Sequence, residues 1–205
     1  SPINGTIHLV YDLHGYSTDL PEDGRFANDY FRYSYSIPSA AEVSDDEFAL
    51  SLFVPDTSEI SEGPDDYKHL TMTGSLEHKE NFDILSAPVF HLAEDGTLLF
   101  NARKGGNNNG AYVFNRYDAA TQTWTDMYDF NMVHAKKLGN SYNWSPYGDM
   151  KYLNGKFRVA FQQRTNINWD KFKYQNGLFY AYSDHPYGER GWKNHKGQVM
   201  TFPLV

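Results

Sequence analysis

Three dipeptides ending in glycine set the organisation of this sequence: Asn4-Gly5, Asp95-Gly96 and Asn154-Gly155. Such pairs favour two-residue type I′ hairpin turns, because both central residues of that turn need positive φ. The runs that follow read NGTIHLVYDLHG, DGTLLFNARKGG and NGKFRVAFQQRT, and after a polar loop each is followed by a second aromatic run. The sequence therefore predicts a repeated antiparallel hairpin unit.

Repeats of about 40–50 residues with four short strands are typical of β-propeller blades. Apolar residues alternate or cluster in short runs and rarely follow a helical period, so we expect an all-β fold. We divide the chain, as a single domain 1–205, into units at about 1–80, 81–135 and 136–205. Because a closed propeller has at least about four blades, we expect about three blades of a larger ring. The remaining blades would come from the same or another chain.

The first unit is longer than the others, and we place its extra residues at about 37–67. This stretch is rich in proline and acidic residues, which predicts a surface insertion. Within it, the apolar residues of 48–54 suggest a strand.

Composition excludes several classes of protein. The chain has 18 basic and 26 acidic residues, a formal charge of −8, and no Lys/Arg-rich run, which argues against nucleic-acid binding. It has no apolar run of about 18 residues, so we expect no membrane span. The chain has no cysteine, which removes disulfides and thiolate metal sites.

The start at Ser1 suggests an excised piece, and the sequons at Asn4 and Asn143 favour a secreted, extracellular protein.

A longer pattern runs through the second unit. It reads APVFHL, then EDGTLLF, then Arg103, Gly105-Gly106, NRYD and Thr123-Trp124, and related pieces occur at 5–14 and 180–194. This pattern resembles the BNR-4 repeat family, whose members include propeller-fold polysaccharide lyases such as the ulvan lyases. The two turns closed by Trp124 and Trp192 also resemble degenerate Asp-boxes. Asp-boxes support a fold and leave the chemistry open.

The resemblance implies cleavage of an acidic polysaccharide by β-elimination at a uronic acid. A base removes the C5 proton, an acid assists the departing C4 oxygen, and a cation stabilises the enolate-like carboxylate. Arg103 matches the family's site arginine and lies seven residues after Gly96, just before a glycine-rich loop. A guanidinium neutralises a carboxylate without losing its own proton.

The other candidate catalytic residues also come from the resemblance. His14 matches an active-site histidine and Tyr142 matches a family tyrosine before a proline. A second family tyrosine falls on Ala87, and alanine transfers no proton. The chain is therefore a variant lacking that tyrosine, a protein that uses another residue, or an inactive one.

Arg164 lies nine residues after Gly155, as His14 does after Gly5, so both are expected at one face.

Asn107, Asn109, Trp144 and Tyr147 are candidates for substrate binding, through the glycine-rich loop or by stacking on sugar rings. The spacing of the histidines and acidic residues matches no metal-binding motif, and we expect no cofactor. Binding of a structural calcium ion at Asp45-Asp46 or Asp65-Asp66 is an open alternative. A purely structural role is likewise an open alternative for each candidate residue. A non-catalytic carbohydrate-binding propeller, favoured by Ala87, is the alternative function. A sialidase-like hydrolase fits less well, since its arginine triad cannot be assembled here.

Overall fold

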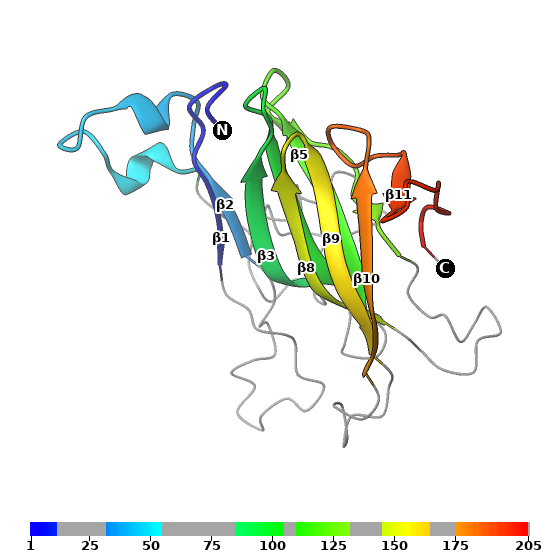
Figure 1. Ribbon diagram of the computed structural model, residues 1–205. Coiled ribbons are helices and arrows are strands. Elements are labelled where there is room, and N and C mark those ends of the chain that lie inside the picture. Colours follow the sequence, from blue (N-terminus) through cyan, green and yellow to red (C-terminus); the bar gives the residue numbers. More distant parts are fainter. Residues whose placement is uncertain (12–31, 55–84, 105–109, 132–144, 165–174, 205) are drawn as a thin grey trace, which may run out of the picture.

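The computed structural model describes residues 1–11, 32–54, 85–104, 110–131, 145–164 and 175–204 (Figure 1). Within these ranges the protein is all-β, apart from two single 3₁₀ turns at Ala40–Glu42 and Leu50–Leu52. All the pairings between its named strands are antiparallel. The all-β, antiparallel prediction is confirmed.

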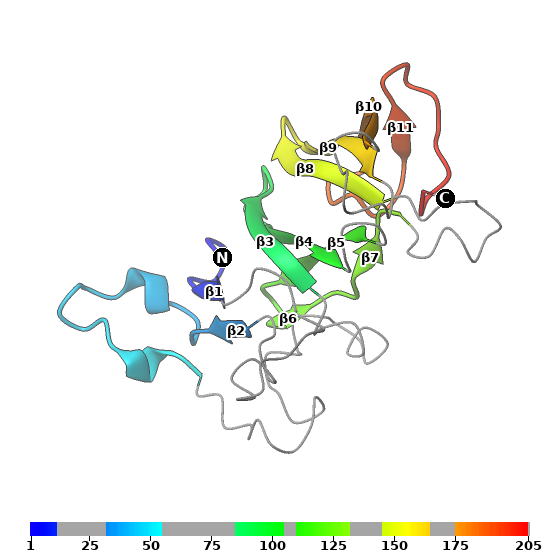
Figure 2. The same cartoon turned by 90° about the horizontal axis from the view of Figure 1, so that it is seen from below.

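The strands form three sheets, which lie side by side when viewed along the strands (Figure 2). The N-terminal sheet consists of β1 (His8–Tyr11) and β2 (Arg32–Tyr35). The central sheet has the order β3-β4-β5-β6 with β7 beside β5, formed by β3 (Leu85–Leu92), β4 (Leu98–Lys104), β5 (Ala111–Asp118), β6 (Thr123–Trp124) and β7 (Tyr128–Asp129). The C-terminal sheet has the order β11-β10-β9-β8, formed by β8 (Ser145–Leu153), β9 (Lys156–Arg164), β10 (Gln175–Ser183) and β11 (Trp192–Asn194).

The three glycine turns precede β1, β4 and β9, and each of these strands pairs with the strand that follows it. Gly5, Gly96 and Gly155 all have positive φ, of 68°, 85° and 71°. Only the last turn has a second positive φ, at Asn154, as a type I′ turn requires. In the other two, the side chains of Asn4 and Asp95 accept a hydrogen bond from the backbone N–H two residues on. The type I′ prediction is thus correct for one turn, and an Asx-type bond closes the others.

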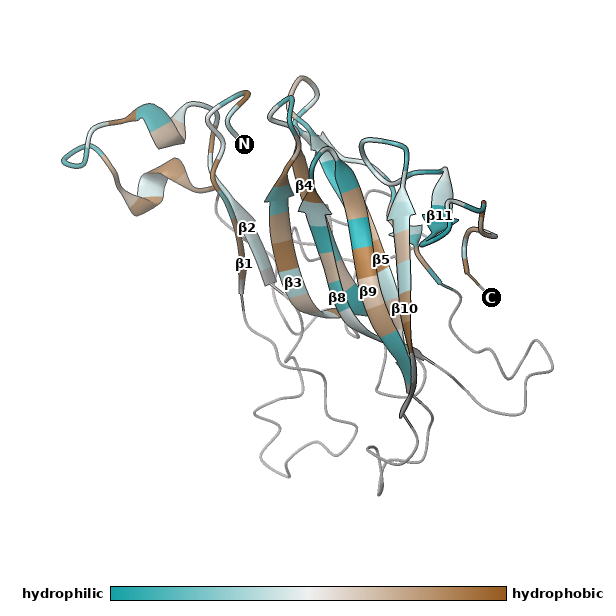
Figure 3. Cartoon of the chain, in the orientation of Figure 1, coloured by the Kyte–Doolittle hydropathy of each residue, from teal (hydrophilic) through white to brown (hydrophobic). Residues whose placement is uncertain are grey.

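The central sheet is buried on both faces, which explains why its strands read as nearly continuous apolar runs. Leu98, Phe100 and Ala102 of β4 pack toward the N-terminal sheet. Leu99 of β4 and Phe114 of β5 pack against the C-terminal sheet, where they join Phe157 and other aromatic residues. Along β9, every second residue from Phe157 to Phe161 is apolar and buried, because one face of that strand is covered (Figure 3). Alternate residues of each strand therefore define the contacts between sheets.

The insertion differs from its predicted structure. Residues 50–52 form a 3₁₀ turn, and only an isolated bridge between Ser36 and Phe53 replaces the strand expected over 48–54. Phe48 is half exposed and Leu50 is 89% exposed, so this segment lacks the packing that would hold a strand in a sheet. The rest of the insertion, from residue 55, lies outside the described residues.

The register gives the sheets two distinct ends. Strands β4 and β9 finish, and β5, β8 and β10 begin, at one end, which we call the site end (the lower end in Figure 1). The turns at Gly96 and Gly155 lie at the opposite end, which we call the turn end. Arg103 and Arg164 therefore belong to the same end of neighbouring sheets.

The Asp-box-like turns perform the structural role expected of them. Trp192 is buried and its Nε1 donates to the carbonyl of Gly188 at 2.7 Å, while Ser183 Oγ donates to the carbonyl of Arg190 at 2.7 Å. In the central sheet, the buried Trp124 Nε1 donates to the phenol oxygen of Tyr33 at 2.9 Å. The indole of Trp192 therefore closes its own turn and contacts Phe114 of the central sheet, whereas the indole of Trp124 bonds across to the N-terminal sheet.

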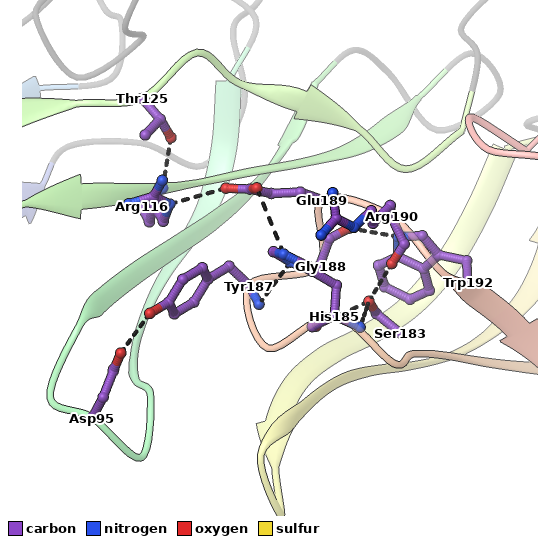
Figure 4. A network of polar contacts seen from close by, with 10 residues as sticks. All are labelled: Asp95, Arg116, Thr125, Ser183, His185, Tyr187, Gly188, Glu189, Arg190 and Trp192. Atoms are coloured by element: carbon purple, nitrogen blue, oxygen red, sulfur yellow. Dashed lines mark hydrogen bonds and ion pairs between the residues drawn. The ribbon is translucent and has the colours of Figure 1, made fainter.

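A polar network joins the central and C-terminal sheets at the turn end (Figure 4). Arg116 of β5 donates from Nε to Glu189 at 2.9 Å, and its guanidinium lies 5.0 Å from the centre of the Tyr187 ring. Tyr187 in turn donates to Asp95 in the turn between β3 and β4. The network lies far from Arg103 along the strands and fixes the packing of the sheets.

Candidate functional site

Arg103 lies at the end of β4, with its side chain half buried at the junction of the central and C-terminal sheets. Its guanidinium carbon is 5.0 Å from the centre of the Tyr147 ring on β8 and 5.8 Å from that of Tyr112 on β5. Tyr112 is its direct cross-strand partner. A cation at this distance from an aromatic face is attracted by the ring quadrupole. Two sheets therefore contribute a ring to the environment of one arginine.

Tyr112 is buried, with 3% of its surface exposed, and its phenol oxygen accepts a hydrogen bond from the N–H of Gly148 at 2.8 Å. Burial raises the pKa of Tyr112, and the positive charge of Arg103 only partly opposes that effect. The phenol is therefore neutral near pH 7. A buried neutral phenol suits a positioning role better than proton transfer to a substrate.

Gly148 of β8 lies close to the backbone of β9. A Cβ at this position would lie 2.0 Å from the carbonyl oxygen of Ala160 and 2.7 Å from the Cα of Phe161. No side chain can be accommodated there without moving a strand. The strand spacing directly beside Tyr147 therefore requires glycine at position 148.

Ala87 lies in a β-bulge beside Arg103. Ser86 pairs with Arg103, and the register then shifts before Val89 pairs with Asn101. Ala87 has a φ of 51° and its side chain is exposed. Left-handed backbone in a residue other than glycine is uncommon and often marks functional sites. The position implied for the family tyrosine is therefore close to the candidate arginine along the paired strands.

A second cation, Lys104, projects from the opposite face of β4. Its ammonium lies 2.7 Å from the carboxylate of Asp129 on β7, and its side chain is only 9% exposed. This ion pair was not predicted, because nothing in the sequence shows that β7 returns beside β5. The charge of Lys104 is therefore paired within the fold by Asp129.

His8 of β1 is a packed residue. Its Nδ1 lies 2.7 Å from the phenol oxygen of Tyr33, and its ring contacts Tyr117 and Trp124 edge-on. Desolvation lowers the pKa of His8 to about 3, so the ring is neutral at physiological pH. These contacts give His8 a structural role in the fold.

The structure brings together some of the predicted site residues. Arg103 and Tyr147 are in contact, and Ala87 follows the strand partner of Arg103. Arg164 pairs through its backbone with Ser145 and Gln175 at the site end. The remaining predicted residues lie outside the described part of the chain: His14, Asn107, Asn109, Tyr142 and Trp144.

In the described ranges, no three histidine or acidic side chains gather closely enough to hold a metal ion. Asp45-Asp46 falls within these ranges and Asp65-Asp66 does not. The described residues also contain no helix long and apolar enough to cross a membrane.

Comparison with known proteins links this geometry to a family. The profile described as "BNR repeat-containing family member" matches residues 28–205. The long-isoform ulvan lyase of Pseudoalteromonas sp. (strain PLSV) is 62% identical over the whole chain, and the chain spans 20% of that protein. The short-isoform ulvan lyase of Alteromonas sp. (strain LOR) is 60% identical over the whole chain, which spans 39% of it.

A solved structure agrees in fold. The crystal structure of polysaccharide lyase Uly1 superimposes on the whole chain with a TM-score of 0.86 and 50% sequence identity, and the chain covers 43% of that structure. The chain thus corresponds to less than half of each of these proteins.

Proposed function

Because the chain belongs to the BNR repeat-containing family, we propose that it is part of a polysaccharide lyase that cleaves a uronate-containing acidic polysaccharide by β-elimination. The observation that carries the proposal is identity of about 60% along the whole chain to proteins named ulvan lyases. The position of Arg103 at a strand end, held between two aromatic rings, supplies the cation that this chemistry needs.

In this proposal, Arg103 pairs with the carboxylate of the uronic acid. The C5 proton is weakly acidic while that carboxylate carries a full charge, and a guanidinium stabilises the additional charge that develops on deprotonation. A base takes the proton, the C5–H electron pair forms the C4–C5 double bond, and the C4–O bond breaks as an acid protonates the leaving oxygen. Arg164 is proposed to bind a neighbouring acidic or sulfated sugar.

Proton transfer is assigned to His14 and Tyr142, on the strength of the family resemblance. A neutral imidazole near pH 7 suits a base, and a phenol near a cation can donate or accept a proton. Ala87 occupies the position at which the family pattern has a third side chain capable of proton transfer, a tyrosine. We therefore propose that acid–base catalysis in this chain either is weaker than the family pattern implies or is carried out by different residues.

The architecture proposed for the complete protein is a β-propeller to which this chain contributes about three blades. The support is that three antiparallel sheets pack side by side, with both faces of the central one covered. The chain also spans only 20–39% of the curated relatives quoted above. The remaining blades are proposed to come from the rest of that protein, which we place outside the cell.

The alternative candidate is a non-catalytic module that binds acidic carbohydrate, favoured by Ala87 at the position of a proton-transferring residue. The deciding experiment follows the ultraviolet absorbance of the unsaturated uronate product when the complete protein is mixed with ulvan. Rising absorbance supports the lyase. Binding of ulvan without any new absorbance supports the module.

A further inference from the structure

We propose that Tyr147 and Tyr112 are positioning residues that fix the orientation of the Arg103 guanidinium, so that an aromatic clamp spanning two sheets prepares the arginine for a sugar carboxylate. This inference rests on the proposed function for the role of Arg103. It goes beyond that function by assigning the clamp, and it changes the role expected of Tyr147 from a sugar platform to a support for the cation.

The clamp is closed by the backbone. Tyr112 stands directly opposite Arg103 on β5, and its phenol oxygen accepts the N–H of Gly148 at 2.8 Å. Gly148 directly follows Tyr147, whose ring lies 5.0 Å from the guanidinium carbon. The contacts therefore run from Arg103 to Tyr112, to Gly148, to Tyr147 and back to Arg103. A shift of β8 relative to β5 would disturb both rings at once.

Burial makes one half of the clamp rigid. Tyr112 is 3% exposed and belongs to the core between the sheets, whereas Tyr147 is 39% exposed at the surface of that junction. β8 is paired with β9 along its length, and at Gly148 only glycine fits because any Cβ would clash with Ala160. Tyr147 is thus a partly exposed ring on a fixed backbone, where it can be altered without opening the core.

A ring contact orients an arginine without using up its hydrogen-bond donors. The arginine side chain has several rotatable bonds, and ordering it on substrate binding costs conformational free energy. A cation–π contact with the face of the guanidinium orders the side chain before substrate binds, and a guanidinium ordered in this way can form a bidentate pair with a carboxylate. Because the charge to be stabilised grows in the transition state, loss of orientation should lower kcat more than it raises KM.

The test compares three variants of the complete protein. Tyr147→Leu removes the ring, and Tyr147→Phe keeps the ring without its hydroxyl. Tyr182→Leu is the matched control, since the Tyr182 ring also lies close to a cation, with its centre 5.2 Å from the ammonium of Lys156, but at the turn end and outside the polar network that joins the sheets. Lyase rates on ulvan are measured for each, and the ring-current-shifted side-chain protons of Arg103 are followed by NMR.

The expected result is a kcat reduced about 2- to 30-fold in Tyr147→Leu, which is the range a cation–π contact supports. In Tyr147→Phe, kcat should return to within about twofold of the parent, and Tyr182→Leu should match the parent. The upfield shift of the Arg103 protons should decrease only in Tyr147→Leu, where the Tyr112 ring alone remains. An unchanged shift in that variant overturns the clamp, as does an equal loss of kcat in Tyr147→Phe. If the parent shows no lyase activity, the proposed function fails, while the NMR comparison still decides the clamp.

Discussion

The backbone N–H of Gly148 donates a hydrogen bond to the buried phenol oxygen of Tyr112, and this bond ties β8 to β5 beside Arg103. The two residues belong to different sheets, 36 positions apart in the sequence. The candidate site is therefore built on a junction between sheets, and its geometry depends on how those sheets pack.

Replacing Gly148 should test how tightly that junction is built. In Gly148→Ala, the new Cβ would lie 2.0 Å from the carbonyl oxygen of Ala160, so a strand must move and the bond to Tyr112 must lengthen. We expect a loss of about 2–4 kcal/mol in the free energy of unfolding, measured by denaturant titration. Gly191→Ala is the control, because its Cβ meets only ordinary contacts at 3.6 Å and it carries only the strain of a positive φ. Its loss should be about 1–2 kcal/mol, and equal losses in both variants would contradict the steric argument.

Arg103 should control the rate of the proposed elimination. Arg103→Gln removes the charge that stabilises the enolate-like carboxylate, and we expect kcat/KM on ulvan to fall by about 10²–10³-fold. Arg103→Lys should recover only part of the loss, since an ammonium cannot pair in a bidentate manner. The control is Arg190→Gln, which removes the same charge from an exposed residue at the turn end. Retention of more than about a third of the activity in Arg103→Gln would exclude the residue from the chemistry.

The half-buried His8 should make the fold sensitive to acid. Its pKa in the folded protein, about 3, lies below its ordinary value of 6.5 because of burial. The unfolded chain therefore binds the proton more readily, so this contribution to stability is complete above about pH 6.5 and is lost as the pH falls toward 3. Because the ring is partly exposed, we expect a loss of about 1–2 kcal/mol between about pH 7.5 and pH 5.

The measurement is the free energy of unfolding at both pH values, for the parent and for His8→Phe. Phenylalanine keeps an aromatic ring beside Tyr33 and Tyr117 but cannot be protonated. The variant should therefore lose less stability on acidification than the parent does. An identical pH dependence in both proteins would show that His8 is not the responsible group.

The fold was largely predictable because its signals are local. A glycine that needs a positive φ and an apolar run beside it lie within a few residues, so the turns at Gly96 and Gly155 and the strands after them could be placed. The segment 48–54 was misjudged because its apolar residues imitate a strand, while pairing depends on a neighbour the sequence does not show.

The site was less predictable because its contacts cross strands and sheets. Arg103 could be proposed as a site residue from its position before a glycine-rich loop and from the family pattern, and this stays a prediction. Tyr112, one of 16 tyrosines, carries no signal of its own until the register sets it opposite Arg103. The Lys104–Asp129 ion pair and the bulge at Ala87 likewise depend on strand pairing. Pairing register is decided by the whole sheet, which is why these features appear only in the structure.

Ala87 offers the sharpest test of the acid–base assignment. It is exposed in a bulge directly after the strand partner of Arg103, so a larger side chain at this position displaces no core residue. Alanine already tolerates the left-handed backbone, with φ of 51°, and tyrosine adds little strain because both residues carry a Cβ. If the missing phenol limits the reaction, Ala87→Tyr should raise the lyase rate of the complete protein by about 10²–10⁴-fold, since that is the usual value of general acid–base assistance. Affinity for ulvan, which depends on the arginines, should change little.

Ala87→Phe is the matched control, because it adds the ring without the hydroxyl and should leave the rate at the level of the parent. An equal rise in both variants would assign the effect to the ring, whereas high activity in the parent with no rise in Ala87→Tyr would show that another residue already carries the proton.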